Sequence, residues 1–202
     1  MNCIRVGLIL LAAGESKRMG TPKQLIEYNR RSLIRHTVEV AIASDCHPII
    51  VVLGANRDRI IPEISNLPVN ICHNRQWQKG MSSSIAVGIE ALAKSEIDAV
   101  IVALADQPLI NTNVYNQLVK HYQTSKQPAI ASAYNHTLGV PALFDRTLFA
   151  ELIDLQGQGG AKKLLKRYSQ PKFNLAVPEA AIDLDTPEDL QHLRSLERNI
   201  IK

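Results

Sequence analysis

The most constraining feature of this 202-residue sequence is a series of short apolar runs that alternate with amphipathic helical patterns. Each run is apolar at both odd and even positions, as expected for a strand that is buried on both faces. Repeated strand–helix–strand units predict right-handed crossovers and a mostly parallel sheet covered by helices. The predicted strands span residues 5–12, 48–53, 69–73, 99–105 and 129–133.

Helical patterns fill the segments between these runs and dominate after residue 144. Ser32 stands where the first helix needs an N-cap. Near the C-terminus, Thr186 can cap a helix that starts with Pro187, and Asp189 follows three residues after that cap. The predicted helices carry the apolar stripe of Leu33, Thr37, Val40 and Ala41, or span residues 83–93, 112–122, 147–153, 161–168 and 187–198.

Composition supports a three-layer α/β fold in a single domain over residues 1–202. The chain is 46% hydrophobic but only 4% aromatic, so its core is built mainly from Ile, Leu, Val and Ala. Those residues are the usual filling of a parallel sheet that lies between helices. The length suits one domain.

Charge and cysteine usage restrict the partners. The net charge of +4 suits anionic small molecules, although a surface that happens to be basic explains it equally well. The sequence has no basic stripe with interleaved aromatics, the pattern that would indicate nucleic acid binding. Cys3, Cys46 and Cys72 form no C-x-x-C pair, which fits a reducing cytoplasm. The apolar run 6–13 is too short for a membrane span or a signal peptide, so we expect a cytoplasmic protein without a membrane partner.

The first predicted strand leads directly into L-A-A-G-E-S-K-R-M-G-T-P-K-Q-L, residues 11–25. In parallel sheets, ligands bind beyond the carboxyl ends of the strands. The small residues at 12–14 allow a ligand close to the backbone, where successive N–H groups can bind an anion. Arg18 and Lys23 bring two cations to the same loop, which therefore predicts a phosphate site.

The spacing in this loop excludes two common phosphate-binding motifs. Gly14 and Gly20 are six residues apart and Thr21 follows, so the chain has no Walker A sequence. The G-x-G-x-x-G fingerprint of NAD-binding domains is also absent. No G-x-S-x-G elbow supports a serine hydrolase, and the six histidines form no H-x-x-x-H pattern.

Two further motifs follow predicted strands. N-R-Q-W-Q-K-G-M-S-S-S-I, residues 74–85, places Gly80 and three serines at a helix start that can hold a base edge or a phosphate, with plain N-capping an equal alternative for the serines. We expect its Trp77 to pack in the core. A-D-Q-P, residues 105–108, puts Asp106 on the carboxyl edge of the sheet, where the Mg²⁺ of a triphosphate needs oxygen ligands.

A fourth motif, D-L-D-T-P-E-D-L at residues 183–190, completes a resemblance that runs from residue 6 to about residue 193. Together the motifs resemble those of the nucleotidyltransferases related to the molybdenum cofactor enzymes, and within them the cytidylyltransferase (MocA-like) branch. The guanylyltransferase branch typically has glycine at the position of Ala13 and aspartate at that of Pro22. These two residues therefore favour CTP over GTP.

The resemblance implies transfer of CMP from CTP to the terminal phosphate of molybdenum-molybdopterin, which gives molybdopterin cytosine dinucleotide and pyrophosphate. It implies a fold of the nucleotide-diphospho-sugar transferase type, with a Rossmann-like nucleotide-binding half over about residues 1–110 and an acceptor-binding half over about 111–202. Mg²⁺ is the implied metal, with Mn²⁺ as the alternative. A molybdoenzyme or its chaperone is the implied protein partner.

Site residues are transferred from the family position by position. Asp106 and Asp185 would hold the metal, with Asp183 the less favoured ligand. Arg18, Lys23 and Asp106 are the expected catalytic residues. The expected nucleotide-binding residues are Leu11, Ala12, Ala13, Gly14, Ser16, Arg18, Lys23, Gly80, Met81, Ser82 and Ser84. The expected acceptor-binding residues are Gln107, Gly139, Pro141, Gly159 and Gly160.

Two departures from the family pattern leave the acceptor open. The G-x-P element at 139–141 has Val140 where His or Asn is common, and Gln158 replaces the Asp of a G-D-x-G-A loop. One alternative is a related nucleotidyltransferase with another phosphate acceptor, either a molybdopterin guanylyltransferase that uses GTP or a cytidylyltransferase that acts on a sugar or alcohol phosphate. Another is a nucleotide- or cofactor-binding protein without turnover. The complete set of cations and carboxylates argues against it, because a binding protein needs no full set of metal and leaving-group residues. An NAD-dependent oxidoreductase is disfavoured by the missing glycine fingerprint.

Overall fold

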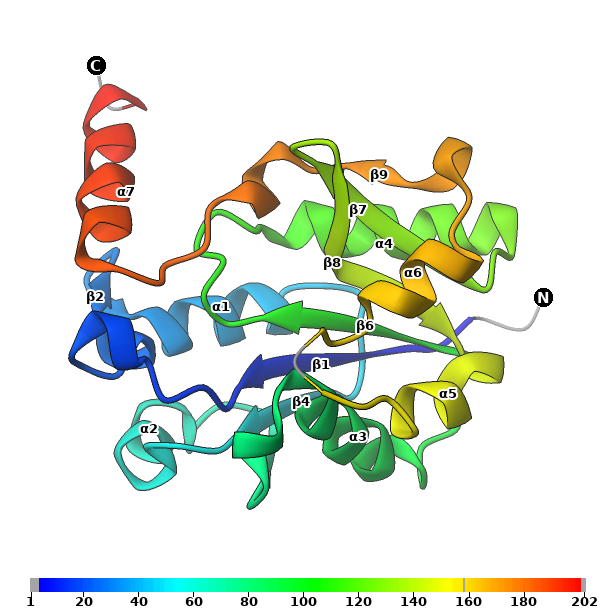
Figure 1. The fold of residues 1–202 in the computed structure, drawn as a ribbon, viewed down its shortest axis with the longest axis horizontal. Helices are drawn as coiled ribbons and strands as arrows, with labels where there is room; N and C mark the ends of the chain where they lie inside the picture. Colours follow the sequence, from blue (N-terminus) through cyan, green and yellow to red (C-terminus); the bar gives the residue numbers. More distant parts are fainter. Residues whose placement is uncertain (1–3, 158, 201–202) are drawn as a thin grey trace.

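The structure is a computed structural model that describes residues 4–157 and 159–200. Its main sheet has seven strands in the order β5-β4-β1-β6-β8-β7-β9 (Figure 1). The strands β1 (Val6–Ala12), β4 (Ile49–Leu53), β5 (Asn70–His73) and β6 (Ala99–Leu104) run parallel to their neighbours among these four. The predicted mostly parallel α/β sheet is therefore confirmed.

The second half of the sheet departs from the parallel pattern. β8 is antiparallel to both β6 and β7, whereas β9 pairs with β7 in parallel. The sequence did not predict β8, because Gly139 and Pro141 interrupt its apolar pattern and usually mark turns or edges. The bounds are Ala129–Tyr134 for β7, Thr137–Asp145 for β8 and Leu175–Ala176 for β9, and a separate small hairpin joins β2 (Glu27–Tyr28) to β3 (Arg31–Ser32).

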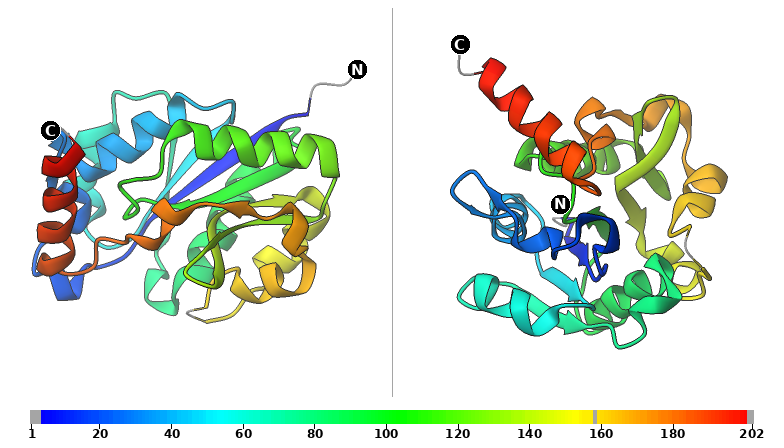
Figure 2. Two further views of the ribbon diagram at one scale, coloured as in Figure 1. Left: turned by 90° about the horizontal axis from the view of Figure 1, so that it is seen from above. Right: turned by 60° about the vertical axis from the view of Figure 1, so that its left-hand side comes forward.

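Helices cover both faces of the sheet and give the predicted three layers (Figure 2). All seven residues of β1 are buried, and because successive residues point to opposite faces, Leu8 and Leu10 join one core cluster while Ile9 and Leu11 join the other. One face is covered by α1 (Leu33–Ile42), α2 (Arg57–Ile64) and α4 (Thr112–Ser125), and the other by α3 (Met81–Leu92), α5 (Phe149–Ile153) and α6 (Lys162–Tyr168).

The helix predictions were correct in most places. Ser32 caps α1 as predicted, with its hydroxyl accepting a hydrogen bond from the Arg35 N–H. α2 was not predicted, since it contains Pro62 and only two of its residues are buried apolar ones. Within the described residues, no helix combines the length and apolar character needed to cross a membrane. Short 3-10 turns are η1 (Lys17–Met19), η2 (Lys23–Leu25), η3 (Trp77–Lys79), η4 (Arg146–Leu148), η5 (Pro171–Phe173) and η6 (Pro178–Ala181).

The C-terminal helix α7 (Pro187–Ile200) projects from the main body near β2 (Figure 1). Its first turn forms the predicted capping box: the Thr186 N–H donates to Asp189 Oδ2 at 2.8 Å, and the Asp189 N–H donates to Thr186 Oγ1 at 3.3 Å. Leu184 and Leu193 pack with Met19 in a small separate cluster. The segment before α7 is thereby held next to the loop that follows β1.

Candidate active site

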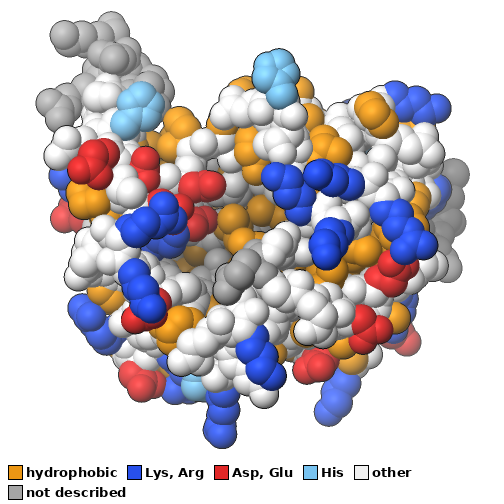
Figure 3. Space-filling model, viewed as in Figure 1, with side chains coloured by type: hydrophobic (Ala, Val, Ile, Leu, Met, Phe, Trp, Pro, Cys, Tyr) orange, Lys and Arg blue, Asp and Glu red, His pale blue; other side chains and the backbone are white. Residues whose placement is uncertain are grey.

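A cavity of about 580 Å³ opens at the carboxyl ends of β1 and β6. Figure 3 shows a hollow in this face of the molecule, with hydrophobic side chains in its depth and charged side chains on its rim. The loop after β1 and the start of α3 form two of the cavity walls. The predicted residues that line it are Leu11, Ala12, Ala13, Gly14, Ser16, Arg18, Lys23, Gly80, Met81, Ser84 and Asp106.

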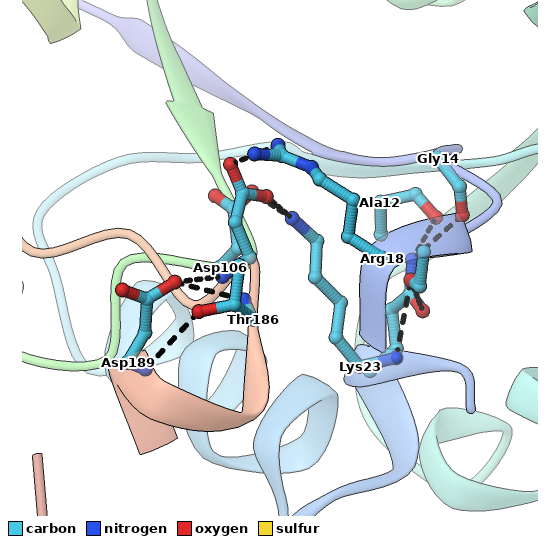
Figure 4. Close-up of polar contacts among 10 residues, drawn as sticks. Ala12, Gly14, Arg18, Lys23, Asp106, Thr186 and Asp189 are labelled. Carbon is cyan, nitrogen blue, oxygen red and sulfur yellow. Dashed lines mark hydrogen bonds and ion pairs between the residues drawn. The ribbon is translucent and has the colours of Figure 1, made fainter. Parts of the chain in front are cut away.

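Four charged side chains form a connected cluster at the cavity. Lys23 Nζ lies 2.5 Å from Asp106 Oδ2 and 2.7 Å from Asp185 Oδ1. Arg18 Nη2 lies 2.6 Å from Asp185 Oδ2. Figure 4 shows Lys23 pointing from the loop after β1 toward Asp106, with Arg18 alongside. The structure thus brings together the four charged residues that the sequence analysis had placed at one site.

Burial and charge act in opposite directions on this cluster. Burial alone would lower the pKa of Lys23, but Asp106 and Asp185 raise it above its ordinary value through their charges and hydrogen bonds. Burial alone would raise the pKa of Asp185, but its contacts with Lys23 and Arg18 lower it. Lys23 and Asp185 are therefore held in their charged forms, with the Lys23 side chain only 13% exposed.

The loop after β1 is fastened through its carbonyl groups and leaves N–H groups free. Gln24, which is buried, donates from Nε2 to the carbonyl oxygens of Ala12 at 3.2 Å and Gly14 at 3.1 Å. Ser16 Oγ accepts from the Lys23 N–H at 3.1 Å. Within the part of the chain that the structure describes, the N–H groups of residues 14–17 donate no hydrogen bond. Successive free N–H groups of this kind suit an anionic ligand.

A buried amide fixes two hydroxyl groups at the start of α3. Asn74 Nδ2 donates to Ser83 Oγ at 2.8 Å and to Ser84 Oγ at 2.9 Å. Gly80, directly before the helix, has a φ of 100°, a conformation that favours glycine. Ser84 lines the cavity, whereas Ser82 is buried with an unpartnered hydroxyl and lines a separate hollow beside α3. The structure thus separates Ser82 from the other predicted nucleotide-binding residues.

Trp77 lies elsewhere than expected. The sequence analysis placed it in the core, but its side chain is half-buried and lines the cavity. A Cβ atom on Gly54 would lie 2.6 Å from Trp77 Cβ and 2.6 Å from the Ala13 carbonyl oxygen. Only glycine therefore lets the loop after β1 and the Trp77 turn approach this closely. The N-x-x-W motif pointed to a place for Trp77 at the site, but a single large apolar side chain was expected to be a core residue.

The predicted acceptor residues lie outside the lining of this cavity. Gln107 is buried, and its Nε2 donates to the Ala180 carbonyl at 3.0 Å and the Val140 carbonyl at 3.4 Å. Pro141 is also buried, and its carbonyl accepts from Ser132 Oγ. These two residues therefore tie segments of the chain together.

The predicted acceptor glycines are placed differently from one another. A Cβ on Gly139 would lie 2.1 Å from the Tyr134 hydroxyl oxygen, so the tyrosine packs directly over this glycine. A Cβ on Gly160 would lie 2.6 Å from Met81 Sδ, so Gly160 packs against a residue that lines the cavity. Gly159 has open space around it. Gln158 lies outside the described residues.

Two carboxylates, rather than a full ligand cage, are available to a metal. Among the residues that the structure describes, no group of three or more His, Cys, Asp or Glu side chains could hold a metal ion. Asp106 Oδ1 is nevertheless buried without a hydrogen-bond partner. Mg²⁺ is commonly bound by one or two carboxylates together with substrate phosphates and waters. Asp106 and Asp185 fit that arrangement.

Comparison with known families agrees with this geometry. The model of the MobA-like NTP transferase domain matches residues 8–172. The nicotine blue oxidoreductase of Paenarthrobacter nicotinovorans is 33% identical over 197 residues, covering 92% of this chain and 94% of that protein. The purine catabolism protein PucB of Bacillus subtilis is 26% identical over 200 residues, with 92% of this chain and 94% of that protein covered.

Solved structures share the fold over almost the whole chain. The crystal structure of Rv0371c from Mycobacterium tuberculosis has a TM-score of 0.82 and 26% identity, covering 96% of this chain and 98% of that one. A manganese complex of Rv0371c has a TM-score of 0.78 and 24% identity, covering 94% of this chain and 97% of that one.

Proposed function

The chain belongs to the MobA-like NTP transferase family, and from this premise we propose that it transfers CMP from CTP to the terminal phosphate of molybdenum-molybdopterin. The products would be molybdopterin cytosine dinucleotide and pyrophosphate. The observation that carries the proposal is the cluster of Lys23, Asp106 and Asp185, of which Lys23 and Asp106 line the cavity together with the loop of free backbone N–H groups. Ala13 and Pro22 favour CTP over GTP.

In the proposed reaction, an acceptor phosphate oxygen attacks the α-phosphorus of CTP. A new oxygen–phosphorus bond forms, and the bond from the α-phosphorus to the bridging oxygen of pyrophosphate breaks. A phosphate monoester is already ionised near neutral pH, so the site needs no strong general base. The chain's contribution would be positioning and charge stabilisation.

The loop after β1 would bind the triphosphate. Its free N–H groups would face the phosphate oxygens, and Arg18 and Lys23 would neutralise the charge that builds on the leaving pyrophosphate. Lys23 would then exchange its carboxylate partners for phosphate oxygens. Asp106 and Asp185 would hold Mg²⁺, which supplies charge stabilisation at the α-phosphate. The manganese complex of Rv0371c supports a divalent metal in this fold.

A second candidate is an oxidoreductase, because this chain is 33% identical to the nicotine blue oxidoreductase of Paenarthrobacter nicotinovorans. Such an enzyme would bind a nicotinamide or other redox cofactor. The absent G-x-G-x-x-G fingerprint weighs against a nicotinamide dinucleotide of the Rossmann type. Nucleotide binding distinguishes the two candidates directly.

We would measure thermal stabilisation by CTP, GTP, ATP and UTP with Mg²⁺, and by NADH and NADPH. A ligand at one hundred times its dissociation constant adds about 2.7 kcal/mol of stability. We expect a clear preference for CTP that is lost in Asp106→Ala and kept in Asp154→Ala, an exposed carboxylate at the end of α5. Equal stabilisation by all four triphosphates would overturn the cytidylyl assignment. Stabilisation by NADH or NADPH alone would favour the oxidoreductase.

A further inference from the structure

A second hollow, of about 530 Å³, lies between the β7–β8 turn and α6. Lys162 and Lys166 line it from α6, and His136 lines it from the turn. The two lysines are four residues apart, so they lie on the same face of the helix. This hollow therefore has a basic wall that the proposed chemistry does not use.

The two lysines leave their charges uncompensated. Like charges at positions i and i+4 destabilise a helix by about 0.2–0.5 kcal/mol. Within the described part of the chain, neither Lys162 nor Lys166 forms an ion pair, whereas the adjacent Arg167 pairs with Glu151 at 3.5 Å. An anionic ligand between the lysines would remove their repulsion. The pair therefore offers two positive charges to an anionic ligand in the hollow.

Two contacts connect this hollow to the proposed reaction site. Tyr134 lines the hollow and packs over Gly139, and its pKa is raised by burial and by the charges of Asp183 and Asp106. The tyrosine hydroxyl therefore lies within electrostatic reach of the carboxylate cluster. On the other side, α6 begins two residues after Gly160, which contacts Met81 of the main cavity. The hollow and the main cavity share no lining residue, and these two contacts connect them.

We propose that Lys162 and Lys166 bind a second anionic group of the acceptor, distinct from the phosphate that attacks CTP. This inference rests on the proposed function and specifies its acceptor class: a phosphate monoester that carries another anionic group. In molybdenum-molybdopterin, that group would be the dithiolene-bound metal. The lysines would set the affinity for the acceptor and leave the affinity for CTP unchanged.

The test uses the full chain with CTP, Mg²⁺ and molybdenum-molybdopterin, and compares the wild type with K162Q/K166Q. The matched control is Lys163→Gln, which removes a lysine from the same helix that does not line the hollow. Hydrogen bonds to charged groups predict a rise of about 10- to 100-fold in the acceptor KM of the double variant. The KM for CTP, and kcat at saturating acceptor, should stay within about threefold of the wild type, and raised salt should reduce the difference.

The outcomes separate the two proposals. An acceptor KM in K162Q/K166Q equal to that of the wild type and of Lys163→Gln would overturn the inference and leave the proposed function intact. A wild type that binds CTP but does not convert molybdenum-molybdopterin would overturn the proposed function and the inference with it. A raised CTP dissociation constant in the folded double variant would assign the lysines to the nucleotide and would also overturn the inference.

Discussion

The main cavity and the hollow beside α6 hold their charged groups in different ways. On the side of the loop after β1, Lys23 and Asp106 are 13% and 19% exposed and are bound to each other. On the α6 side, Lys162 and Lys166 are exposed and form no ion pair within the described residues. Paired, buried groups are positioned before a ligand arrives, which suits charge stabilisation in a reaction. Exposed, unpaired groups become ordered with the ligand, which suits selection among acceptors.

Lys23→Met gives the largest effect that this comparison predicts. Methionine keeps much of the apolar stem but removes the charge that would neutralise the leaving pyrophosphate. We expect kcat/KM for pyrophosphate release to fall by about 100-fold or more. Lys94→Met, an exposed lysine beyond the end of α3, is the control. Equal activity in the two folded variants would contradict the role given to the buried side.

Gly160→Ala tests whether the two sides are coupled. The new methyl group would lie 2.6 Å from Met81 Sδ, at a residue whose φ is +51°. Because Met81 lines the main cavity, where we propose that CTP binds, we expect CTP to bind about fivefold more weakly, equivalent to ~1 kcal/mol. Isothermal titration calorimetry would measure this change. Gly159→Ala, which has open space around it, should leave the CTP dissociation constant unchanged; matching losses in both variants would disprove coupling through Met81.

Tyr122→Phe predicts the smallest effect and should spare ligand binding altogether. The Tyr122 hydroxyl donates to Asp145 Oδ2 at 2.5 Å, away from the cavity. Burial alone would raise the pKa of Asp145, but hydrogen bonds from Thr147 and Tyr122 lower it below its ordinary value of 3.8. We expect the variant to lose about 1 kcal/mol of unfolding free energy at neutral pH.

The pH dependence of this loss has a defined sign. A carboxyl group whose folded-state pKa is lowered stabilises the fold above its unfolded-state pKa, and this stabilisation disappears as the pH falls through the folded-state value. The difference between wild type and Tyr122→Phe should therefore shrink below about pH 4 in denaturant titrations. A difference that stayed constant to pH 3, or one that was accompanied by weaker CTP binding, would contradict the assignment.

The buried half of the molecule could be predicted well from the sequence. β1, β4 and β6 are apolar on both faces, which few structures other than a covered parallel strand explain. Lys23 and Asp106 each follow such a strand, so the sheet itself brings them to one edge. Asp185 came from family resemblance alone, because nothing in its local sequence says where the segment before α7 lies.

The region around β8 and α6 could not be predicted to the same extent. β8 was not predicted because Gly139 and Pro141 favour turns. In the structure, pairing of this segment with β6 and β7 overrides that local preference. The spacing of Lys162 and Lys166 is visible in the sequence, but the hollow that they face depends on how α6 packs. The position of Ser82 could not be predicted either. Neighbouring residues of α3 point to different sides of the helix, so Ser84 lines the main cavity while Ser82 lines another hollow.

The bond between Arg18 and Asp185 joins residues that are 167 positions apart. Local opening of a protein often begins at its ends and leaves the central strands intact. If α7 detached, Asp185 would leave the cluster while the seven-stranded sheet kept its secondary structure. Enzymatic turnover would then decline during mild heating before the main loss of circular dichroism, so catalysis reports on the integrity of the C-terminal segment.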